Sequence, residues 1–226
     1  MSETQNHMNN YIKTIYDVNK RPLNSYPEKL VNHLYQRFSL APGMKLLEVG
    51  CGRCDHLKIY KTFGLDVYGL DFSQDAVDLT PEINIKECNM EKDTIPYPDE
   101  FFDVIYTKSF LEHLENPTNF LKEAKRVLKK NGTIITLVPD WESNMAIYFD
   151  DFSHKSPYTT YSLKDLYEIH GLRNSDVFLF RQLPIVWKFP VLNYLCAFLA
   201  IFTPHRSKIK FLRWSKELMV VGVAKK

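Results

Sequence analysis

The chain has 226 residues, which is enough for one domain of ordinary size with a substantial hydrophobic core. Hydrophobic residues make up 45% and charged residues 25% of it, a composition typical of a soluble globular protein. The net charge of +2 is too small to indicate nucleic-acid binding, and the polar first ten residues lack the apolar core of a secretory signal, so we expect a cytoplasmic protein with reduced cysteines.

Two helices are predicted ahead of the first strand. Apolar residues recur at helical spacing over residues 8–20, and a second such run extends from Pro27, a residue favoured in the first turn of a helix, to about Leu40. We expect residues 1–40 to form a helical cap on the domain. The pattern leaves open whether this cap packs on the edge of the domain or covers a bound ligand.

A strand, a tight turn and a helix are then predicted in succession. Leu46–Val49 has the length of a buried strand, Gly50 and Gly52 interrupt it, and a segment with helical periodicity follows. Such a glycine turn lets backbone N–H groups approach a ligand closely at the positive end of a helix. The carboxylate of Glu48 would repel a phosphate at this turn, but it suits hydroxyl, ammonium or sulfonium groups.

The same turn contains a C-x-x-C pattern, Cys51 and Cys54. A pair of thiols at a helix N-terminus is typical of a redox centre, because the helix lowers the thiol pKa. A zinc site would need a second pair of ligands, and Cys88 and Cys196 stand alone in the sequence. The glycine turn explains the local pattern better than either reading, and we predict no metal site.

The next strand is predicted over residues 66–71 and ends in an acid, Asp71. Asp71 lies about 20 residues beyond the glycine turn, the spacing at which a carboxylate at a strand end accepts hydrogen bonds from both hydroxyls of a ribose. The alternative is an aspartate that caps a helix. Since Ser73 is already well placed to cap the helix Gln74–Leu79, the ribose role is favoured for Asp71.

Strands and helices continue to alternate to the end of the chain, which predicts a doubly wound α/β sheet of seven strands. Asn116 and Pro117 are predicted to start one helix, as its cap and its first residue, and Lys129–Gly132 to close it. Ser162 is predicted to cap another helix that ends at Gly171. The later strands are predicted over residues 83–88, 104–107, 133–138, 177–180 and 218–224.

Glu48-x-Gly50-x-Gly52-x-Cys54 resembles motif I of the class I S-adenosylmethionine-dependent methyltransferases, Glu/Asp-x-Gly-x-Gly-x-Gly, with a cysteine at the third glycine. Three later segments resemble the family's "LPFPDxSFDVV", "xxEHL" and "E-x-x-RVLKPGGxLxIxxP", namely residues 95–106, 110–114 and 123–139. This likeness is to methyltransferases of type 11. It implies one Rossmann-like domain over residues 1–226, with strand order 3-2-1-4-5-7-6 and strand 7 antiparallel.

The resemblance implies S-adenosyl-L-methionine as the cofactor. Asn89 stands where the family has an aspartate that meets the adenine amino group, and Met90 where an apolar residue packs on the ring. His113 and His154 are candidate catalytic bases for an alcohol acceptor. The residues predicted to bind the cofactor are Glu48, Gly50, Cys51, Gly52, Asp71, Phe72, Asn89, Met90, Thr107 and Lys108.

Residues 183–216 form an unusually long insertion between the last two strands. Its first part is a strongly apolar run over residues 191–202, too short to span a bilayer, and its second part is rich in lysine and arginine. One interpretation is an extra helix that thickens the core beside a solvated basic face. The other is a substrate cap or a patch that contacts a membrane surface.

The sequence therefore predicts a methyltransferase whose acceptor is a small molecule or is linked to a lipid or glycan. The acceptor atom is predicted to be oxygen. One alternative is a nicotinamide-dependent oxidoreductase, but its third glycine would fall at Asp55 and Glu48 would face the pyrophosphate. Another is a methyltransferase-like domain that binds a partner without catalysis. A nucleic-acid acceptor is disfavoured, because the end of the fourth strand, Thr107–Phe110, lacks the Asn/Asp-Pro-Pro-aromatic motif of amino-directed DNA enzymes.

Overall fold

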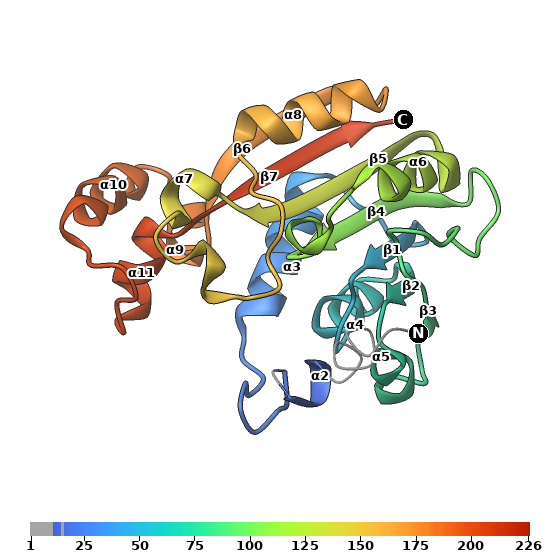
Figure 1. The fold of residues 1–226 in the computed structure, drawn as a ribbon, viewed down its shortest axis with the longest axis horizontal. Coiled ribbons are helices and arrows are strands. Elements are labelled where there is room, and N and C mark those ends of the chain that lie inside the picture. The colour runs from blue at the N-terminus through green and yellow to red at the C-terminus, as the bar shows by residue number, and fades with distance from the viewer. Residues whose placement is uncertain (1–10, 15) are drawn as a thin grey trace. The chain divides into compact units, whose positions relative to one another are not determined.

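The computed structural model describes residues 11–14 and 16–226 (Figure 1). Chain contacts divide the protein into two compact units. The first contains residues up to Thr107, Pro117–Thr133 and Lys226, and the second contains Lys108–Asn116 and Ile134–Lys225.

The strands form a seven-stranded sheet in the order β3-β2-β1-β4-β5-β7-β6. β1 pairs in parallel with β2 and with β4, β2 pairs in parallel with β3, and β6 and β7 are antiparallel. The predicted Rossmann-like strand order is thus confirmed. The strands are β1 (Lys45–Val49), β2 (Asp66–Asp71), β3 (Asn84–Glu87), β4 (Phe102–Lys108), β5 (Leu128–Pro139), β6 (Arg173–Arg181) and β7 (Leu218–Lys225).

In the first unit, helices follow the strands as their sequences predict. β1 is buried along almost its whole length, as expected for a central parallel strand whose two faces are covered. Ser73 caps α5 as predicted, since its hydroxyl accepts a hydrogen bond from the Asp75 amide at 3.2 Å. The helices of this unit after the N-terminal segment are α3 (Tyr26–Arg37), α4 (Asp55–Thr62), α5 (Gln74–Leu79) and α6 (Thr118–Val127).

The N-terminal segment is less helical than the sequence predicts. Helix α2 covers only Tyr11–Thr14, and the following residues turn instead of continuing it. The Asp17 carboxylate accepts a hydrogen bond from the Asn19 amide at 2.8 Å, a local turn that competes with the helix. Residues 8–10 and 15 of the predicted helix, and residues 1–10 of the predicted cap, lie outside the described residues.

The junction between α6 and β5 differs from the prediction in two ways. Pro117, not Asn116, immediately precedes the first helical residue, and no side chain caps this end. Lys129–Gly132, predicted as the end of the helix, belongs to β5. The Lys129 ammonium binds both oxygens of the Asp103 carboxylate at 2.8 Å, which holds this stretch extended along the sheet.

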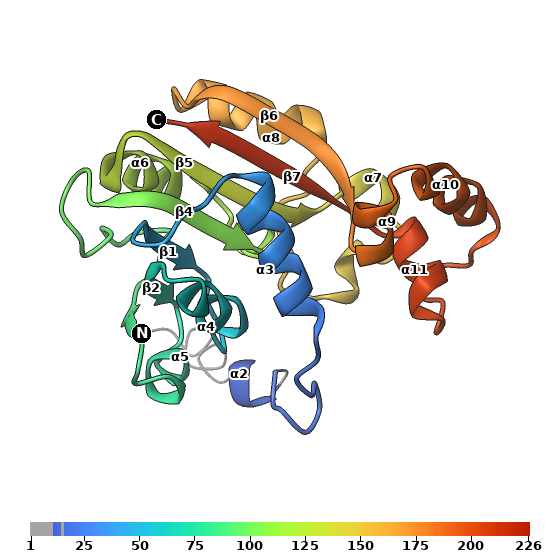
Figure 2. The same ribbon diagram turned by 180° about the vertical axis from the view of Figure 1, so that it is seen from behind.

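In the second unit, α8 (Thr160–Ile169) packs along β6 and β7 (Figures 1 and 2). Its cap is Thr159 rather than the predicted Ser162. The Thr159 hydroxyl accepts from the Ser162 amide at 3.2 Å, and the Ser162 hydroxyl accepts from the Thr159 amide at 2.9 Å. The two residues therefore cap the helix together, with Ser162 in its first turn. The second unit also contains three short helical elements before α8. They are the 3₁₀ helices η1 (Leu111–His113) and η2 (Tyr148–Asp150) and the helix α7 (Trp141–Asn144).

The insertion folds into three short helices, α9 (Pro184–Lys188), α10 (Leu192–Phe202) and α11 (Lys210–Lys216), of which α10 and α11 lie side by side (Figure 2). Only one residue of α10, Cys196, is buried, and it packs with Leu183 and Val186. Within the described chain, no helix combines the length and the hydropathy that crossing a bilayer requires.

Candidate functional site

The turn after β1 has the backbone geometry that its glycines predict. Gly50 and Gly52 adopt φ values of 76° and 50°, in the left-handed region that favours glycine. The third position of the motif, Cys54, has φ 61°, so it keeps the conformation of a glycine although it carries a side chain. The Gly50 amide donates to the Leu70 carbonyl at 2.8 Å, which ties the turn to the end of β2.

The two cysteines of the turn do not have the properties of a redox pair. Both are buried free thiols. A hydrogen bond with Cys54, together with burial, raises the pKa of the Cys51 thiol well above its ordinary value. Since the thiolate is the reactive form, a raised pKa makes this thiol unreactive. The structure thus supports a packing role for Cys51 and Cys54.

Asp71 lies at the end of β2 directly against the glycine turn. One carboxylate oxygen accepts from the Gly52 amide at 2.8 Å, and the other accepts from the Ser73 amide at 2.9 Å. The Tyr11 hydroxyl contacts both oxygens, at 3.1 and 2.9 Å. Burial raises the pKa of Asp71, and the amide hydrogen bonds oppose that rise. The carboxylate that was predicted to hold a ribose therefore holds a side chain of the N-terminal segment.

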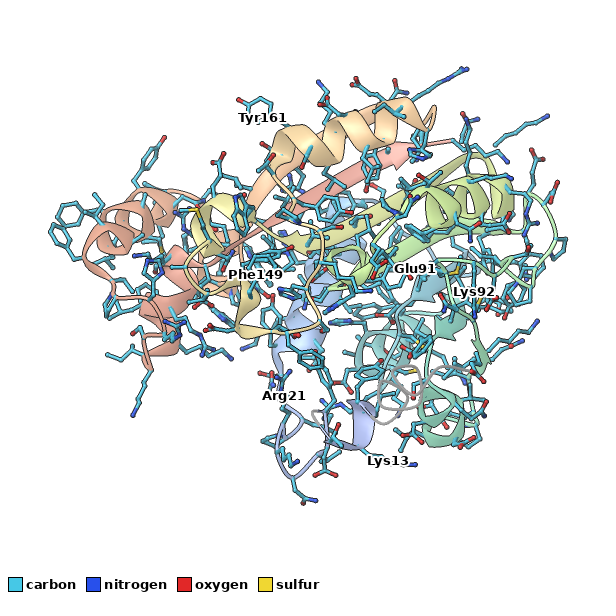
Figure 3. All side chains as sticks on the ribbon, viewed as in Figure 1. Lys13, Arg21, Glu91, Lys92, Phe149 and Tyr161 are labelled. Carbon is cyan, nitrogen blue, oxygen red and sulfur yellow. The ribbon has the colours of Figure 1, made fainter. Side chains whose placement is uncertain are left out.

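Two further contacts fasten this N-terminal segment beside the turn. Lys13, which lies on α2 and is labelled in Figure 3, forms an ion pair with Asp75 at 2.5 Å. The Arg53 guanidinium donates to the carbonyls of Tyr16 and Arg21 at 2.8 and 2.7 Å. The sequence showed these residues only as part of an apolar periodic segment or as isolated charges, so neither Tyr11 nor Arg53 was predicted to contribute.

Glu48 is buried near the end of β1, with a side chain 4% exposed. One of its oxygens lies 3.3 Å from Nδ1 of His56, in the first turn of α4. The His56 ring meets the ring of Tyr106 edge to face, with centroids 5.7 Å apart. His56 was not predicted as a site residue, although its position just after the glycine motif could have indicated that it faces Glu48.

The predicted adenine-binding residues form a compact turn after β3. The side-chain oxygen of Asn89 accepts from the Glu91 amide at 3.0 Å, so the structure uses this oxygen within the turn. Met90 is buried, with its sulfur 3.7 Å from the Cys88 sulfur. Glu91, the next residue, is exposed. The adenine-binding role of Asn89 and Met90 stays a prediction.

The remaining predicted cofactor residues lie at the ends of β2 and β4. Phe72 follows Asp71 and is half-buried, and Thr107 is fully buried within β4. Lys108 begins the second unit. Their contact with a cofactor stays a prediction.

The two predicted catalytic histidines meet in the second unit. The rings of His113, in η1, and His154 have centroids 5.0 Å apart. The segment that carries His154 is held against η1, since the Glu112 carbonyl accepts from the Lys155 amide at 2.7 Å. The Ser156 hydroxyl adds a hydrogen bond to the Leu114 carbonyl at 2.7 Å. Ser153 and His113, 40 positions apart in the chain, thus belong to one cluster.

Hydrogen bonds fix one nitrogen of each ring. Nδ1 of His113 lies 3.0 Å from the Ser153 hydroxyl, which in turn donates to the Asp151 carboxylate at 2.6 Å. Nδ1 of His154 lies 2.7 Å from the Tyr148 carbonyl. Burial, and then the nearby His154, lower the pKa of His113, which favours a neutral ring. Both rings thus have their Nδ1 edge engaged.

Glu112 completes this cluster and was not predicted as a site residue. Its side chain is fully buried, and neither carboxylate oxygen has a hydrogen-bond partner among the described residues. Burial raises its pKa to about 8, although the nearby amides of Glu112 and Phe110 and the charge of Lys108 act in the opposite direction. A ligand atom of Glu112 and one of each histidine all lie within 4.8 Å of one another.

Comparison with known proteins matches residues 47–136 to the methyltransferase domain family. A phosphoethanolamine N-methyltransferase 1 of Zea mays is 28% identical over 60% of this chain and 28% of its own length. A 2-methyl-6-phytyl-1,4-hydroquinone methyltransferase of Synechocystis is 32% identical over 46% of this chain and 34% of its own. The chain spans between 28% and 64% of the length of the first curated relatives that it matches.

Solved structures share the fold. A SAM dependent methyltransferase from Archaeoglobus fulgidus superposes with a TM-score of 0.67 at 18% identity, covering 95% of this chain and 99% of that one. The matched family segment contains the glycine turn, Asp71 and the Glu112–His113 pair.

Proposed function

We propose that this chain, a member of the class I S-adenosylmethionine-dependent methyltransferase family, transfers a methyl group from that cofactor to a small-molecule or lipid- or glycan-linked acceptor. The observation that carries the proposal is the carboxylate of Asp71 held against the glycine turn, within the segment that matches the family. This carboxylate presents two acceptor oxygens at the end of a parallel strand, where ligands of open α/β sheets bind.

The residues of the first unit fit such a cofactor. A ribose carries two neighbouring hydroxyls, and the Tyr11 hydroxyl already contacts both Asp71 oxygens as such a diol would. If Tyr11 is displaced, the two Asp71 oxygens can accept hydrogen bonds from the ribose hydroxyls. The backbone amides of the glycine turn would then approach the rest of the cofactor. The charge of Glu48 favours an ammonium or a sulfonium. When bound, the cofactor supplies the activated methyl group and its thioether leaving group.

Binding of the cofactor is the direct test. We expect calorimetry to detect S-adenosylmethionine and S-adenosylhomocysteine at micromolar Kd, and to detect neither NAD nor NADP. The reason is that Glu48 repels a pyrophosphate at the turn while it suits a cationic sulfonium ligand. Tight NAD binding without S-adenosylmethionine binding would show that the chain is an oxidoreductase instead. Cofactor binding without turnover of any acceptor would favour the non-catalytic alternative.

We propose oxygen as the acceptor atom, because the second unit holds two histidines suited to activating a hydroxyl. Burial lowers the pKa of His113, which favours the neutral ring that a general base requires, and the ring of His154 lies beside it with the two centroids 5.0 Å apart. The curated relatives are named for different acceptors, phosphoethanolamine in one and a hydroquinone in the other, and so they leave this choice to experiment.

The exposed surface of the insertion, residues 183–216, favours an acceptor that is amphiphilic or bound to a membrane. Four apolar residues of α10 are 58% to 80% exposed, and lysines lie on the helices and loop around them. A surface that pairs exposed aromatic and aliphatic side chains with cations suits an anionic lipid interface. The exposed α10 residues are Tyr194, Phe198, Ile201 and Phe202, and the exposed lysines are Lys188, Lys208 and Lys210.

Vesicle binding tests this surface. We expect the protein to sediment with vesicles that contain phosphatidylserine, and the double variant Phe198→Asp with Phe202→Asp to lose at least about tenfold in partition, since it removes apolar area and adds negative charge. Ile169→Asp is the matched control, because Ile169 is 80% exposed on α8. Equal binding of all three proteins would exclude α10 as a membrane contact, while cofactor affinity should be the same in each.

A further inference from the structure

We propose that Glu112, His113 and His154 bind a divalent transition-metal ion in the second unit. One carboxylate oxygen and one nitrogen from each ring lie within 4.8 Å of one another. Ligand atoms bonded to one ion at about 2.1 Å lie roughly 3 to 4 Å apart, so a small rotation of these side chains would complete the site. No thiol takes part, so the cysteine pattern of the sequence gives no indication of this site.

The hydrogen bonds of the two histidine rings use Nδ1 and leave Nε2 available as a metal ligand. In metal sites, a histidine almost always donates its other ring N–H to an oxygen acceptor, namely a carboxylate, a backbone carbonyl or water. His154 does this with Nδ1 to the Tyr148 carbonyl at 2.7 Å, and His113 with Nδ1 to the Ser153 hydroxyl at 3.0 Å. Each Nδ1 then carries the proton, and each Nε2 presents the lone pair that a metal binds.

The buried carboxylate is the second, independent observation. Glu112 is fully buried, and both of its oxygens lack a hydrogen-bond partner among the described residues. A buried carboxylate without partners is costly when ionised, and a divalent cation would stabilise it. A purely structural role gives no reason for placing this carboxylate beside two oriented imidazoles.

A second layer of residues supports the ligands. The Ser153 hydroxyl links His113 to the Asp151 carboxylate, which it reaches at 2.6 Å. The Glu112 carbonyl holds the following loop through the Lys155 and Ser156 amides at 2.7 and 3.1 Å. One ionised glutamate and two neutral imidazoles leave a charge of +1 on the bound ion, and Asp151 lies one hydroxyl away to offset it.

The ligand set selects the class of metal. Two imidazoles and one carboxylate suit Mn²⁺, Fe²⁺, Co²⁺, Ni²⁺ or Zn²⁺, whereas Mg²⁺ and Ca²⁺ prefer oxygen ligands throughout. Three protein ligands also leave open positions on the ion, the arrangement of a catalytic rather than a structural metal site. In this role the two histidines are ligands, and an acceptor hydroxyl bound at an open position would be acidified by the ion rather than by a histidine base.

Metal binding can be measured on the full chain without cofactor or acceptor, so its outcome is separate from that of methyl transfer. The metal-stripped protein is titrated with Zn²⁺, Mn²⁺ and Co²⁺ by calorimetry, and the visible absorption of bound Co²⁺ reports nitrogen and oxygen coordination. We expect one ion per chain for the wild type. Glu112→Gln and His154→Ala should each weaken its affinity at least about a hundredfold, and Ser153→Ala about tenfold to a hundredfold.

Matched variants separate the site from unspecific binding. Glu115→Gln changes a nearby glutamate whose side chain is 73% exposed, and His170→Ala changes the histidine that follows the last residue of α8. Both variants should bind the ion like the wild type. Co²⁺ spectra of the wild type test the site even if a variant fails to fold. Wild-type protein that binds none of the three ions, or a folded Glu112→Gln variant that binds them unchanged, would overturn the proposal and leave Glu112 as a buried carboxylic acid.

Discussion

Asp71→Ala is expected to lose at least about a hundredfold in affinity for S-adenosylmethionine while the protein stays folded. The variant removes both acceptor oxygens, and hydrogen bonds to a charged group contribute about 1.5–3 kcal/mol each. Calorimetry gives the affinity, and circular dichroism shows whether the fold is kept. Asp71→Asn is the matched variant, because it preserves the shape of the side chain but not its charge. Wild-type affinity in Asp71→Ala would show that the ribose does not bind there.

Tyr11→Phe is the internal control for this assignment. The Tyr11 hydroxyl contacts both Asp71 oxygens, so it competes with a ribose for the same acceptors. Its removal should leave cofactor affinity unchanged or raise it, while Asp71→Ala lowers it. Weaker binding by Tyr11→Phe would mean that this hydroxyl contacts the bound cofactor instead of yielding to it.

Arg126→Leu is expected to lower the free energy of unfolding by about 3 kcal/mol. The Arg126 guanidinium donates to the Glu123 carboxylate at 2.7 Å, to the Ile95 carbonyl at 2.8 Å and to Asp99 at 2.7 Å. The variant leaves the Glu123 carboxylate, 9% exposed, without its cation, and breaking such a pair costs about 3–5 kcal/mol. We expect the lower end of this range because the Arg126 side chain is 27% exposed, so that water screens part of the interaction. Urea denaturation measures the change.

Lys122→Leu serves as the control for that variant, because Lys122 is exposed on the same helix and the loss of unfolding free energy should stay within about 0.5 kcal/mol.

The ion pair between Arg126 and Glu123 also predicts that stability depends on pH. The hydrogen bond with Arg126 lowers the pKa of Glu123, so its stabilisation is present above the ordinary pKa and is lost as the pH falls through the lowered value. The difference between wild type and Arg126→Leu should therefore be larger at about pH 7 than at about pH 3. A difference that does not change with pH would contradict this assignment.

The features of this protein that depend on local patterns could be predicted from its amino-acid sequence. Gly50 and Gly52 indicated the left-handed turn, the apolar runs indicated the strands, and the position of Asp71 indicated the ligand side of the sheet. These features are readable because each follows from the conformational preference or the periodicity of neighbouring residues. The N-terminal cap of α8 was predicted at Ser162, three residues after its actual position at Thr159, because both residues belong to one capping box.

Which side chains contact one another follows from the packing of distant segments and could not be predicted. Tyr11 reaches Asp71 from 60 residues away, and Ser153 reaches His113 from 40 residues away. The burial of Glu112 cannot be read from the "EHL" motif that contains it, and the loop that binds its carbonyl comes from a later part of the chain. Helical periodicity likewise extended α2 past Thr14, where the Asp17 turn ends it. Local preference fixes the backbone of a turn or a strand, but the distance between two functional groups depends on how remote segments pack, and a single sequence does not carry that pairing.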